Sequence, residues 1–175
     1  MLHPATLTRL CAAAAVAAFA TLGQPAEAQQ FAAPTGKVIL SISGAIGNTN
    51  SDGKLELDMA LLQSLPQHEF ATSTIWTEGM STFKGVLLQD LLNAAGATGT
   101  SLTLTALNDY QIVMPTADAG PEGPLVAFLL NGEEMPVRDK GPLWVVYPYD
   151  SKADYRTEQA YARSIWQLYR IEVTD

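Results

Sequence analysis

Apolar and polar residues alternate along several short stretches of this chain, which is the pattern of β-strands with one buried face. The alternation predicts strands at residues 37–44, 55–57, 101–107, 111–115 and 165–173. Residues 125–130 and 143–147 are apolar without interruption, and such short runs are typical of strands that are buried on both faces. The chain is therefore expected to be rich in strands, with a turn at 108–110 and a tight turn at Asn131-Gly132.

Helical spacing replaces this alternation in a few places. Asp58 is suited to cap a short helix at residues 59–65, and Pro66 directly after it would end that helix. One helical turn is expected at 159–164, after a polar stretch at 151–158 that is typical of a loop or a flap. Two or three short helices beside many strands predict a mixed α+β domain.

The stretch from Thr72 to Gly96 combines both periods. Its β-branched start predicts a strand as far as Ile75, and the apolar spacing from Val86 predicts a helix that Gly96 caps. Between them, residues 76–84 are expected to form a loop that carries an aromatic residue, a carboxylate and a lysine. Because binding sites are usually built on loops, this loop is the first place to look for a site.

The first 28 residues have the pattern of a secretory signal peptide. Arg9 precedes an apolar, alanine-rich run, and the small residues at 26 and 28 suit cleavage after Ala28. The run is shorter than the roughly 20 residues that span a membrane, so we expect no membrane anchor after cleavage. The mature chain is then expected to be periplasmic or secreted, with a flexible leader at 29–36 and a single domain at 37–175.

Composition narrows the chemistry. The one cysteine, Cys11, falls inside the predicted signal peptide, so the mature chain would offer no thiolate. His68 is the only histidine after residue 28, so we do not expect a histidine-based metal site. A formal net charge of −8 disfavours nucleic acid as a partner.

Candidates for a ligand pocket are aromatic, charged or polar residues near predicted loops and turns. They are Trp76, Glu78, Asn108, Tyr110, Arg138, Lys140, Trp144, Tyr147 and Tyr149. Each also has a purely structural interpretation, since the aromatic residues can pack in the core, Glu78 can be a solvated carboxylate, and Arg138 and Lys140 can form surface ion pairs. Both interpretations stay open, and no catalytic residue or metal ligand is expected.

A set of motifs follows one order along the chain: Phe83 to Leu92 with Ala95-Gly96, then Asn108-Asp109-Tyr110, Leu130 to Glu133, Gly141-Pro142-Leu143, and a closing strand with Ile171 and Val173. In this order and spacing, from about Lys37 to Val173, the chain resembles the oxidoreductase molybdopterin-binding domain family. This is the central fold of sulfite oxidase and of the periplasmic methionine sulfoxide reductase. The resemblance implies a mixed-sheet α+β fold, redox activity and a molybdopterin cofactor.

The resemblance also implies a cysteine thiolate that holds molybdenum, in the loop corresponding to Thr74 to Gly79. This chain has a threonine there, and a neutral hydroxyl is a poor ligand for such a metal. Family enzymes tend to carry an arginine after the segment that matches Gly141-Pro142-Leu143, where this chain has Trp144. The chain is also much shorter than the enzymes, which leaves little material to enclose a large anionic pterin.

Two main functional hypotheses follow. In the first, an exported protein keeps the fold without a metal-thiolate centre or cofactor, and binds an unknown small molecule or a periplasmic protein. Its pocket would be bounded by residues 76–84, 108–110 and 138–149. In the second, a periplasmic oxidoreductase binds molybdopterin without a cysteine ligand, and its phosphate meets Arg138, Lys140, Arg156 or Arg163. A purely structural exported domain is a third and weaker hypothesis, and the resemblance alone does not decide whether the chain is an enzyme.

Overall fold

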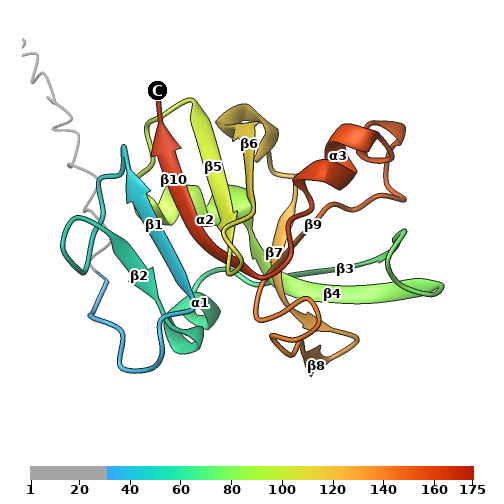
Figure 1. Ribbon diagram of the computed structural model, residues 1–175, viewed down its shortest axis with the longest axis horizontal. Coiled ribbons are helices and arrows are strands. Elements are labelled where there is room, and N and C mark those ends of the chain that lie inside the picture. Colours follow the sequence, from blue (N-terminus) through green and yellow to red (C-terminus); the bar gives the residue numbers. More distant parts are fainter. Residues whose placement is uncertain (1–30) are drawn as a thin grey trace, which may run out of the picture.

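The computed structural model describes residues 31–175, which form two sheets that share one core (Figure 1). The first sheet has the strand order β2-β1-β10-β5-β6. Its strands are β1 (Leu40–Gly44), β2 (Leu55–Leu57), β5 (Ser101–Ala106), β6 (Gln111–Pro115) and β10 (Leu168–Thr174). Strands β1 and β10 pair in parallel and the other neighbours pair antiparallel, so this sheet is mixed.

The second sheet is antiparallel and carries the loops that matter for the site. Its strands are β3 (His68–Ser73), β4 (Met80–Leu87), β7 (Leu125–Leu130), β8 (Glu133–Glu134) and β9 (Trp144–Val146). Strand β7 pairs with β4 from Leu125 to Leu130, and it also pairs with β9 at Leu125 to Ala127 and with β8 at Leu129 and Leu130. Its apolar run is buried from Leu125 to Phe128, as the uninterrupted hydrophobic pattern predicted.

Helical segments are short and lie between the strands. They are α1 (Met59–Ser64), α2 (Leu88–Ala95) and α3 (Glu158–Arg163), with 3₁₀ turns η1 (Thr116–Asp118) and η2 (Ala153–Tyr155). The Asp58 side chain caps α1 by accepting the Leu61 N–H at 2.9 Å, as predicted. Gly96 ends α2 with a left-handed backbone, φ 62°, which confirms the predicted cap. Within residues 31–175, no helix is long and apolar enough to cross a membrane.

A continuous hydrophobic core joins the two sheets. Buried side chains come from β1 and β5 of the first sheet, from β4 and β9 of the second, and from one face of α2, which lies behind the first sheet in Figure 1. Leu40, Leu104, Phe83 and Leu91 all have no exposed surface. Burying each such side chain is worth about 2 kcal/mol, so the core is the main source of stability.

The central stretch differs from its prediction. Residues 80–87 form strand β4, although the sequence predicted a loop at 76–84 and a helix from Val86. Strand β4 pairs on one side with β3, with Phe83 opposite Phe70, and on the other with β7. Tertiary pairing therefore overrides the helical spacing as far as Leu87, and the helix begins at Leu88.

The two ends of the domain also show local differences. The last strand begins at Leu168 rather than at 165, since Gln167 has a positive φ of 54° that interrupts the extended backbone, and the pairing with β5 then shifts register between Leu168 and Arg170. At the other end, the predicted signal peptide and residues 29–30 lie outside the described part of the chain. The rest of the predicted leader contacts the domain: Phe31 is buried, and the Gly36 N–H donates to Asp58 Oδ2 at 2.7 Å.

Candidate ligand-binding site

The connection between β3 and β4 is a tight loop, 74–79, organised by one threonine. Thr74 Oγ1 accepts the backbone N–H groups of Trp76 at 3.0 Å and Thr77 at 2.9 Å, and lies 2.8 Å from Thr77 Oγ1. Gly79 closes the loop with φ 63°, a backbone conformation that residues with a Cβ rarely adopt. Trp76 is half-buried against the domain, whereas Ile75 beside it is 65% exposed.

The ring of Trp76 lies at the centre of an aromatic cluster. Its centroid is 5.7 Å from Trp144, 6.3 Å from Tyr149, 5.8 Å from Tyr161 and 5.9 Å from Trp166. All four contacts are edge-to-face, with interplanar angles between 61° and 85°. Edge-to-face pairs contribute about 0.5–1.5 kcal/mol each beyond burial, so the cluster fixes where the loop sits.

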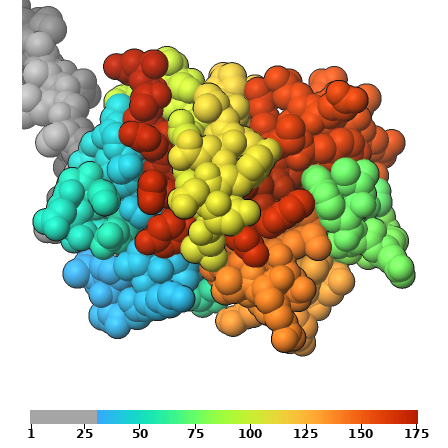
Figure 2. All heavy atoms as spheres, viewed as in Figure 1, coloured from blue at the N-terminus to red at the C-terminus, as the bar shows by residue number. Residues whose placement is uncertain are grey.

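A pocket of about 280 Å³ opens beside Trp76, and we call it the Trp76 pocket. Its walls are Trp76, Ala106, Asn108, Tyr110, Tyr161, Ala162, Ser164, Ile165 and Trp166. None of these residues carries a formal charge at neutral pH. Figure 2 shows the β5–β6 hairpin, which supplies the 106–110 wall, exposed on this face, with the β3–β4 tip projecting at one side. The pocket suits a small, largely apolar molecule.

The polar side chains of the Trp76 pocket differ in whether they already have hydrogen-bond partners within the protein. Asn108 Oδ1 accepts the Tyr110 N–H at 3.2 Å, and its side-chain amide nitrogen has no hydrogen-bond partner among residues 31–175. Ser164 Oγ donates to the Ala160 carbonyl at 2.7 Å and lies 2.5 Å from the Tyr149 hydroxyl. The Asn108 amide is therefore one donor that a ligand can meet, while Ser164 holds the wall together.

Tyr149 supports the cluster from below. It is almost fully buried, and burial raises the pKa of its hydroxyl to about 12, although the Ser164 bond acts in the opposite direction. Trp144, also fully buried, donates its Nε1–H to the Ser164 carbonyl at 3.2 Å. Both residues were candidates for the pocket, and both pack beneath Trp76 without lining it.

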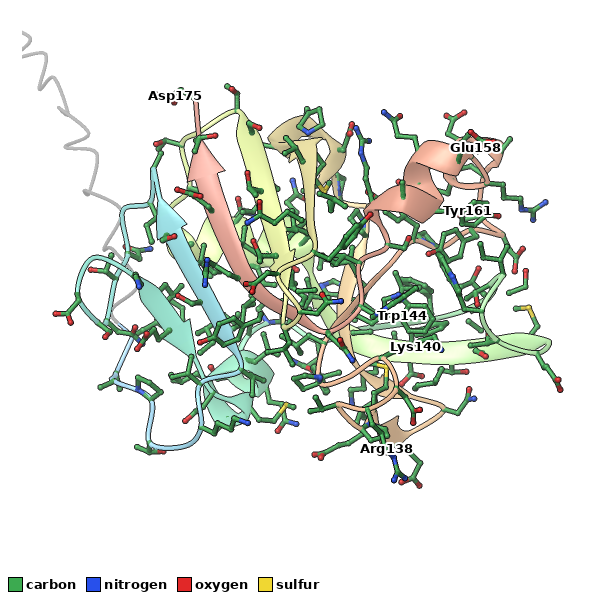
Figure 3. All side chains as sticks on the ribbon, in the orientation of Figure 1. Arg138, Lys140, Trp144, Glu158, Tyr161 and Asp175 are labelled. Carbon is green, nitrogen blue, oxygen red and sulfur yellow. The ribbon has the colours of Figure 1, made fainter. Side chains whose placement is uncertain are left out.

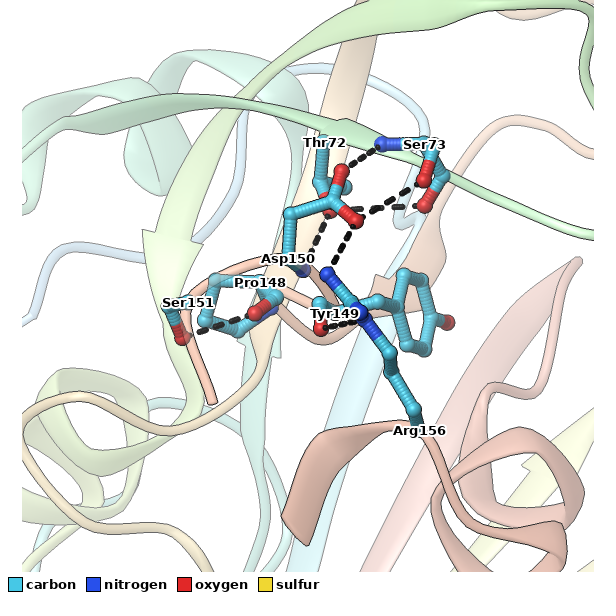
Figure 4. A network of polar contacts seen from close by, with 7 residues as sticks. All are labelled: Thr72, Ser73, Pro148, Tyr149, Asp150, Ser151 and Arg156. Carbon is cyan, nitrogen blue, oxygen red and sulfur yellow. Dashed lines mark hydrogen bonds and ion pairs between the residues drawn. The ribbon is translucent and has the colours of Figure 1, made fainter. Parts of the chain in front are cut away.

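Asp150 connects Ser73, which directly precedes the 74–79 loop, to the segment that carries Tyr149 (Figure 4). Its carboxylate accepts the Ser73 N–H at 2.5 Å and the Ser73 hydroxyl at 2.9 Å, and pairs with Arg156 at 2.9 Å. The Asp150 N–H in turn donates to the Thr72 hydroxyl at 3.1 Å. The Ser73 backbone bond, first among these, holds the pKa of Asp150 below its usual range.

Three of the predicted pocket residues come together and the others do not. Trp76, Asn108 and Tyr110 line the Trp76 pocket, while Glu78 is exposed outside it. Arg138 is exposed on the β8 side of the molecule, away from α3 and Tyr161 (Figure 3). Lys140 lies with its Nζ 5.4 Å from the Trp144 ring centroid, a cation–π contact outside the pocket.

Tyr147, another predicted pocket residue, lines a different cavity and not the Trp76 pocket. It is buried, its ring lies 6.3 Å from Tyr149, and it lines a larger cavity on the far side of that residue. The predicted boundary at 138–149 therefore divides among a cation–π contact, the base of the aromatic cluster and a second cavity.

The sequence interpretation missed the third wall of the pocket. Tyr161, Ser164 and Trp166 close the side that residues 138–149 were expected to close. A signal was present: Tyr161 and Ser164 are three residues apart in a predicted helical turn, so they share a face. Trp166 follows at once, where the chain straightens towards β10.

His68 lies in β3, outside the Trp76 pocket, and contacts a carboxylate. His68 Nε2 lies 2.8 Å from Asp90 Oδ2. Within residues 31–175, no three His, Cys, Asp or Glu side chains are grouped as metal ligands would be.

Comparisons with known proteins agree with this fold. The crystal structure of the sulfane dehydrogenase SoxCD from Paracoccus pantotrophus matches with a TM-score of 0.57 and 16% identity, over 78% of this chain and 38% of that chain. The chain thus spans well under half the length of that protein, and the likeness is one of fold. No curated protein matches this sequence. A family model described as the oxidoreductase molybdopterin binding domain matches residues 39–153, more than half of the chain. The chain therefore belongs to the oxidoreductase molybdopterin-binding domain family and has its mixed-sheet α+β fold.

Proposed function

We propose that this domain is a non-catalytic binding module, which holds a small uncharged aromatic or heteroaromatic molecule in the Trp76 pocket. The observation that carries the proposal is the uncharged, aromatic lining of that pocket. Tyr161, Trp166 and Trp76 offer faces and edges for a planar ring, and the Asn108 amide offers one oriented donor.

The residues present do not fit the molybdenum cofactor of the family. The loop that would supply a thiolate instead has Thr74, whose hydroxyl oxygen already accepts two backbone N–H groups and contacts Thr77. Removing its proton to make a metal ligand would require a very basic environment, and no cation lines the pocket to lower that pKa. We therefore derive no redox step for this site.

The anionic phosphate of a pterin cofactor also lacks a counter-charge here. The arginine expected from the family resemblance is Trp144, which is fully buried under Trp76. Arg156 pairs with Asp150 and Arg163 with Asp118, while Arg138 is exposed on the β8 side. A neutral ligand avoids the cost of desolvating a charge without a partner.

The alternative is a periplasmic oxidoreductase that binds molybdopterin without a cysteine ligand. The family match over residues 39–153 favours it, because the matched region includes the loop and the turn that bound the pocket. For this alternative, Arg156 or Arg163 would have to meet the phosphate while it also pairs with Asp150 or Asp118. The two functions are separated by the charge of the ligand that binds.

The proposal also includes export of the protein from the cytoplasm. The pattern of residues 1–28 supports a periplasmic or secreted protein, and the acidic composition supports a small molecule or a protein partner rather than nucleic acid. Leu107, Tyr110 and Trp166 are between 39% and 54% exposed at the pocket rim, where a periplasmic protein partner would also meet them.

Calorimetric titration of the mature protein with indole and with pterin, both uncharged and planar, tests the proposal. We expect saturable binding of at least one of them, weakened more than tenfold by Trp76→Ala and severalfold by Asn108→Ala. Ile75→Ala is the matched control, since this exposed neighbour lies in the same loop outside the pocket. Absence of binding by both molecules, or equal binding by Trp76→Ala, would contradict the proposal.

A further inference from the structure

A second and larger cavity, of about 590 Å³, lies on the other side of the Tyr147–Tyr149 segment. Its walls come from the η1 turn and the loop after it, 117–122, and from the η2–α3 segment, 152–163. In Figure 1 these segments approach each other at the α3 end of the molecule, next to β6. We call this the Tyr147 cavity, and its volume falls within the range of small-molecule sites.

The Tyr147 hydroxyl is an orphaned polar group in its wall. Tyr147 is 3% exposed, and its hydroxyl is the buried side-chain atom without a hydrogen-bond partner among residues 31–175. Burial raises the pKa of Tyr147, so the hydroxyl keeps its proton at neutral pH and is a donor that needs an acceptor. Because native proteins pair nearly all such groups, this one points to a missing partner.

A partly buried cation, Arg163, lines the same cavity as this hydroxyl. Arg163 has a side chain that is 15% exposed and forms an ion pair with Asp118 from η1. The charges of both groups act on the Tyr147 hydroxyl, in opposite directions. The guanidinium has five N–H donors, and one of them is bonded to Asp118. Arg163 can therefore donate to a further carboxylate beside Asp118.

The opposite wall is closed by contacts between the two segments. Lys152 donates to Glu122 Oε2 at 3.2 Å and lies 4.4 Å from the Tyr155 ring centroid. The Tyr155 hydroxyl donates to the Glu122 carbonyl at 2.7 Å, and its ring is 5.3 Å from Tyr147. These contacts keep the two segments together around the cavity.

The unpaired carboxylate and the unpaired hydroxyl of the cavity together select the class of ligand. The cavity is lined by three carboxylates, Asp118, Glu122 and Asp154, and by two cations, Lys152 and Arg163. Both cations are paired, while Asp154 forms no ion pair within residues 31–175. A simple anion would meet a surplus of negative charge, and a simple amine would leave the Tyr147 hydroxyl without an acceptor.

We propose that the Tyr147 cavity binds a small zwitterion of the α-amino-acid type, with its carboxylate at Tyr147 and Arg163 and its ammonium at Asp118 and Asp154. The carboxylate accepts the orphaned hydroxyl proton and a second bond from the guanidinium. The ammonium meets Asp154, which has no ion pair of its own within residues 31–175, and the carboxylate meets Arg163, so each charge of the ligand has a partner of opposite charge. The Tyr155 ring and Ala160 leave an apolar wall for a side chain.

This site is separate from the Trp76 pocket, and the two share no lining residue. Tyr149 lies between them, with its ring 6.3 Å from both Trp76 and Tyr147. The proposed zwitterion site therefore does not depend on the proposed function, and either one can fail without the other.

A thermal-shift screen of the mature protein with each common amino acid at millimolar concentration is the first test. At least one amino acid is expected to raise the melting temperature. Calorimetry then compares that amino acid with its decarboxylated amine and with its deaminated acid, and we expect each analogue to bind at least tenfold more weakly.

Variants locate the binding. Tyr147→Phe, which removes one hydroxyl and keeps the ring, is expected to weaken amino-acid binding about tenfold, and Arg163→Gln to abolish it. Arg138→Gln, at an exposed arginine on the β8 side, is the control that should bind as the wild type does. No shift with any amino acid, equal binding of the deaminated acid, or unchanged binding by Tyr147→Phe would each overturn the proposal.

Discussion

The Trp76 pocket and the Tyr147 cavity lie on either side of one short segment, yet they differ in almost every physical property. The first is neutral and walled by aromatic rings, and the second is lined by three carboxylates and two cations. Tyr149 and Tyr147 show the difference most clearly. Both are buried and their rings are 6.3 Å apart, but only the Tyr149 hydroxyl has a partner, Ser164.

This difference shows how one family fold can carry two independent sites. In the Trp76 pocket, no lining residue is charged and Ser164 is already bonded within the wall, which leaves shape and ring contacts to select a ligand. In the Tyr147 cavity, an unpaired hydroxyl and an uneven charge balance leave hydrogen bonds to select it. The tests below separate these two modes of selection, from the largest expected effect to the smallest.

Alkaline pH should produce the largest effect, because it acts on both tyrosines together. The unfolded chain loses the Tyr149 proton near pH 10 and the folded chain near 12, so the free energy of unfolding is unaffected below pH 10 and falls as pH rises through this window. Two pKa units correspond to about 3 kcal/mol, and burial of Tyr147 adds loss in the same direction. Urea unfolding across this range, with tyrosinate absorbance, measures both. Ordinary titration of every tyrosine in the folded protein would refute this prediction.

Trp76→Ala should lower the free energy of unfolding by about 2–4 kcal/mol, since it removes a half-buried ring and four edge-to-face contacts. Ile75→Ala, in the same loop but 65% exposed, should change it by less than about 0.5 kcal/mol. Urea denaturation of the two variants gives the comparison. Similar losses in both would mean that the loop, and not the ring, stabilises the cluster.

A matched pair of hydroxyl deletions compares the two tyrosines directly. Tyr149→Phe should cost about 1 kcal/mol because it breaks the bond with Ser164. Tyr147→Phe should raise the stability of the ligand-free protein by about 1 kcal/mol, because it removes a buried donor that has no partner. Thermal unfolding of both variants measures the sign, and equal losses would show that the Tyr147 hydroxyl is satisfied in the free protein.

Asp150→Asn should have the smallest effect, and it should depend on pH. The pKa of Asp150 is lowered by the Ser73 bonds, so its contribution is present above the ordinary carboxyl pKa of 3.8 and disappears as pH falls through the lowered value. The melting temperatures of wild type and variant should differ at neutral pH and should become equal at a pH below the lowered pKa of Asp150. A constant difference at every pH would contradict this role.

Much of the fold was predictable because its strands follow a period of two and its caps obey local chemistry. Strand β5, the return strand β6, the Asp58 cap and the Gly96 cap are all found where the pattern predicted them. Strand β4 was missed because its last residues also fit helical spacing, and only pairing with β3 and β7 decides between the two. Local sequence does not contain that information.

The candidate site was predictable in part, for a similar reason. Trp76 and the 108–110 turn were identified because loops and turns are visible in sequence. Tyr161 and Trp166 reach the pocket only because α3 packs at the end of the first sheet, and that depends on the whole topology. The orphaned Tyr147 hydroxyl has no sequence signature at all, since its state depends on partners from distant segments.

The most direct test of the proposed function is the cofactor content of the full chain produced in a host that makes molybdenum cofactor. Molybdenum would be measured by mass spectrometry and pterin by fluorescence after oxidation, on folded protein. The neutral Trp76 pocket and the bonded Thr74 hydroxyl predict molybdenum and pterin phosphate far below one per chain. One molybdenum and one pterin per chain would contradict the non-catalytic role and favour the oxidoreductase.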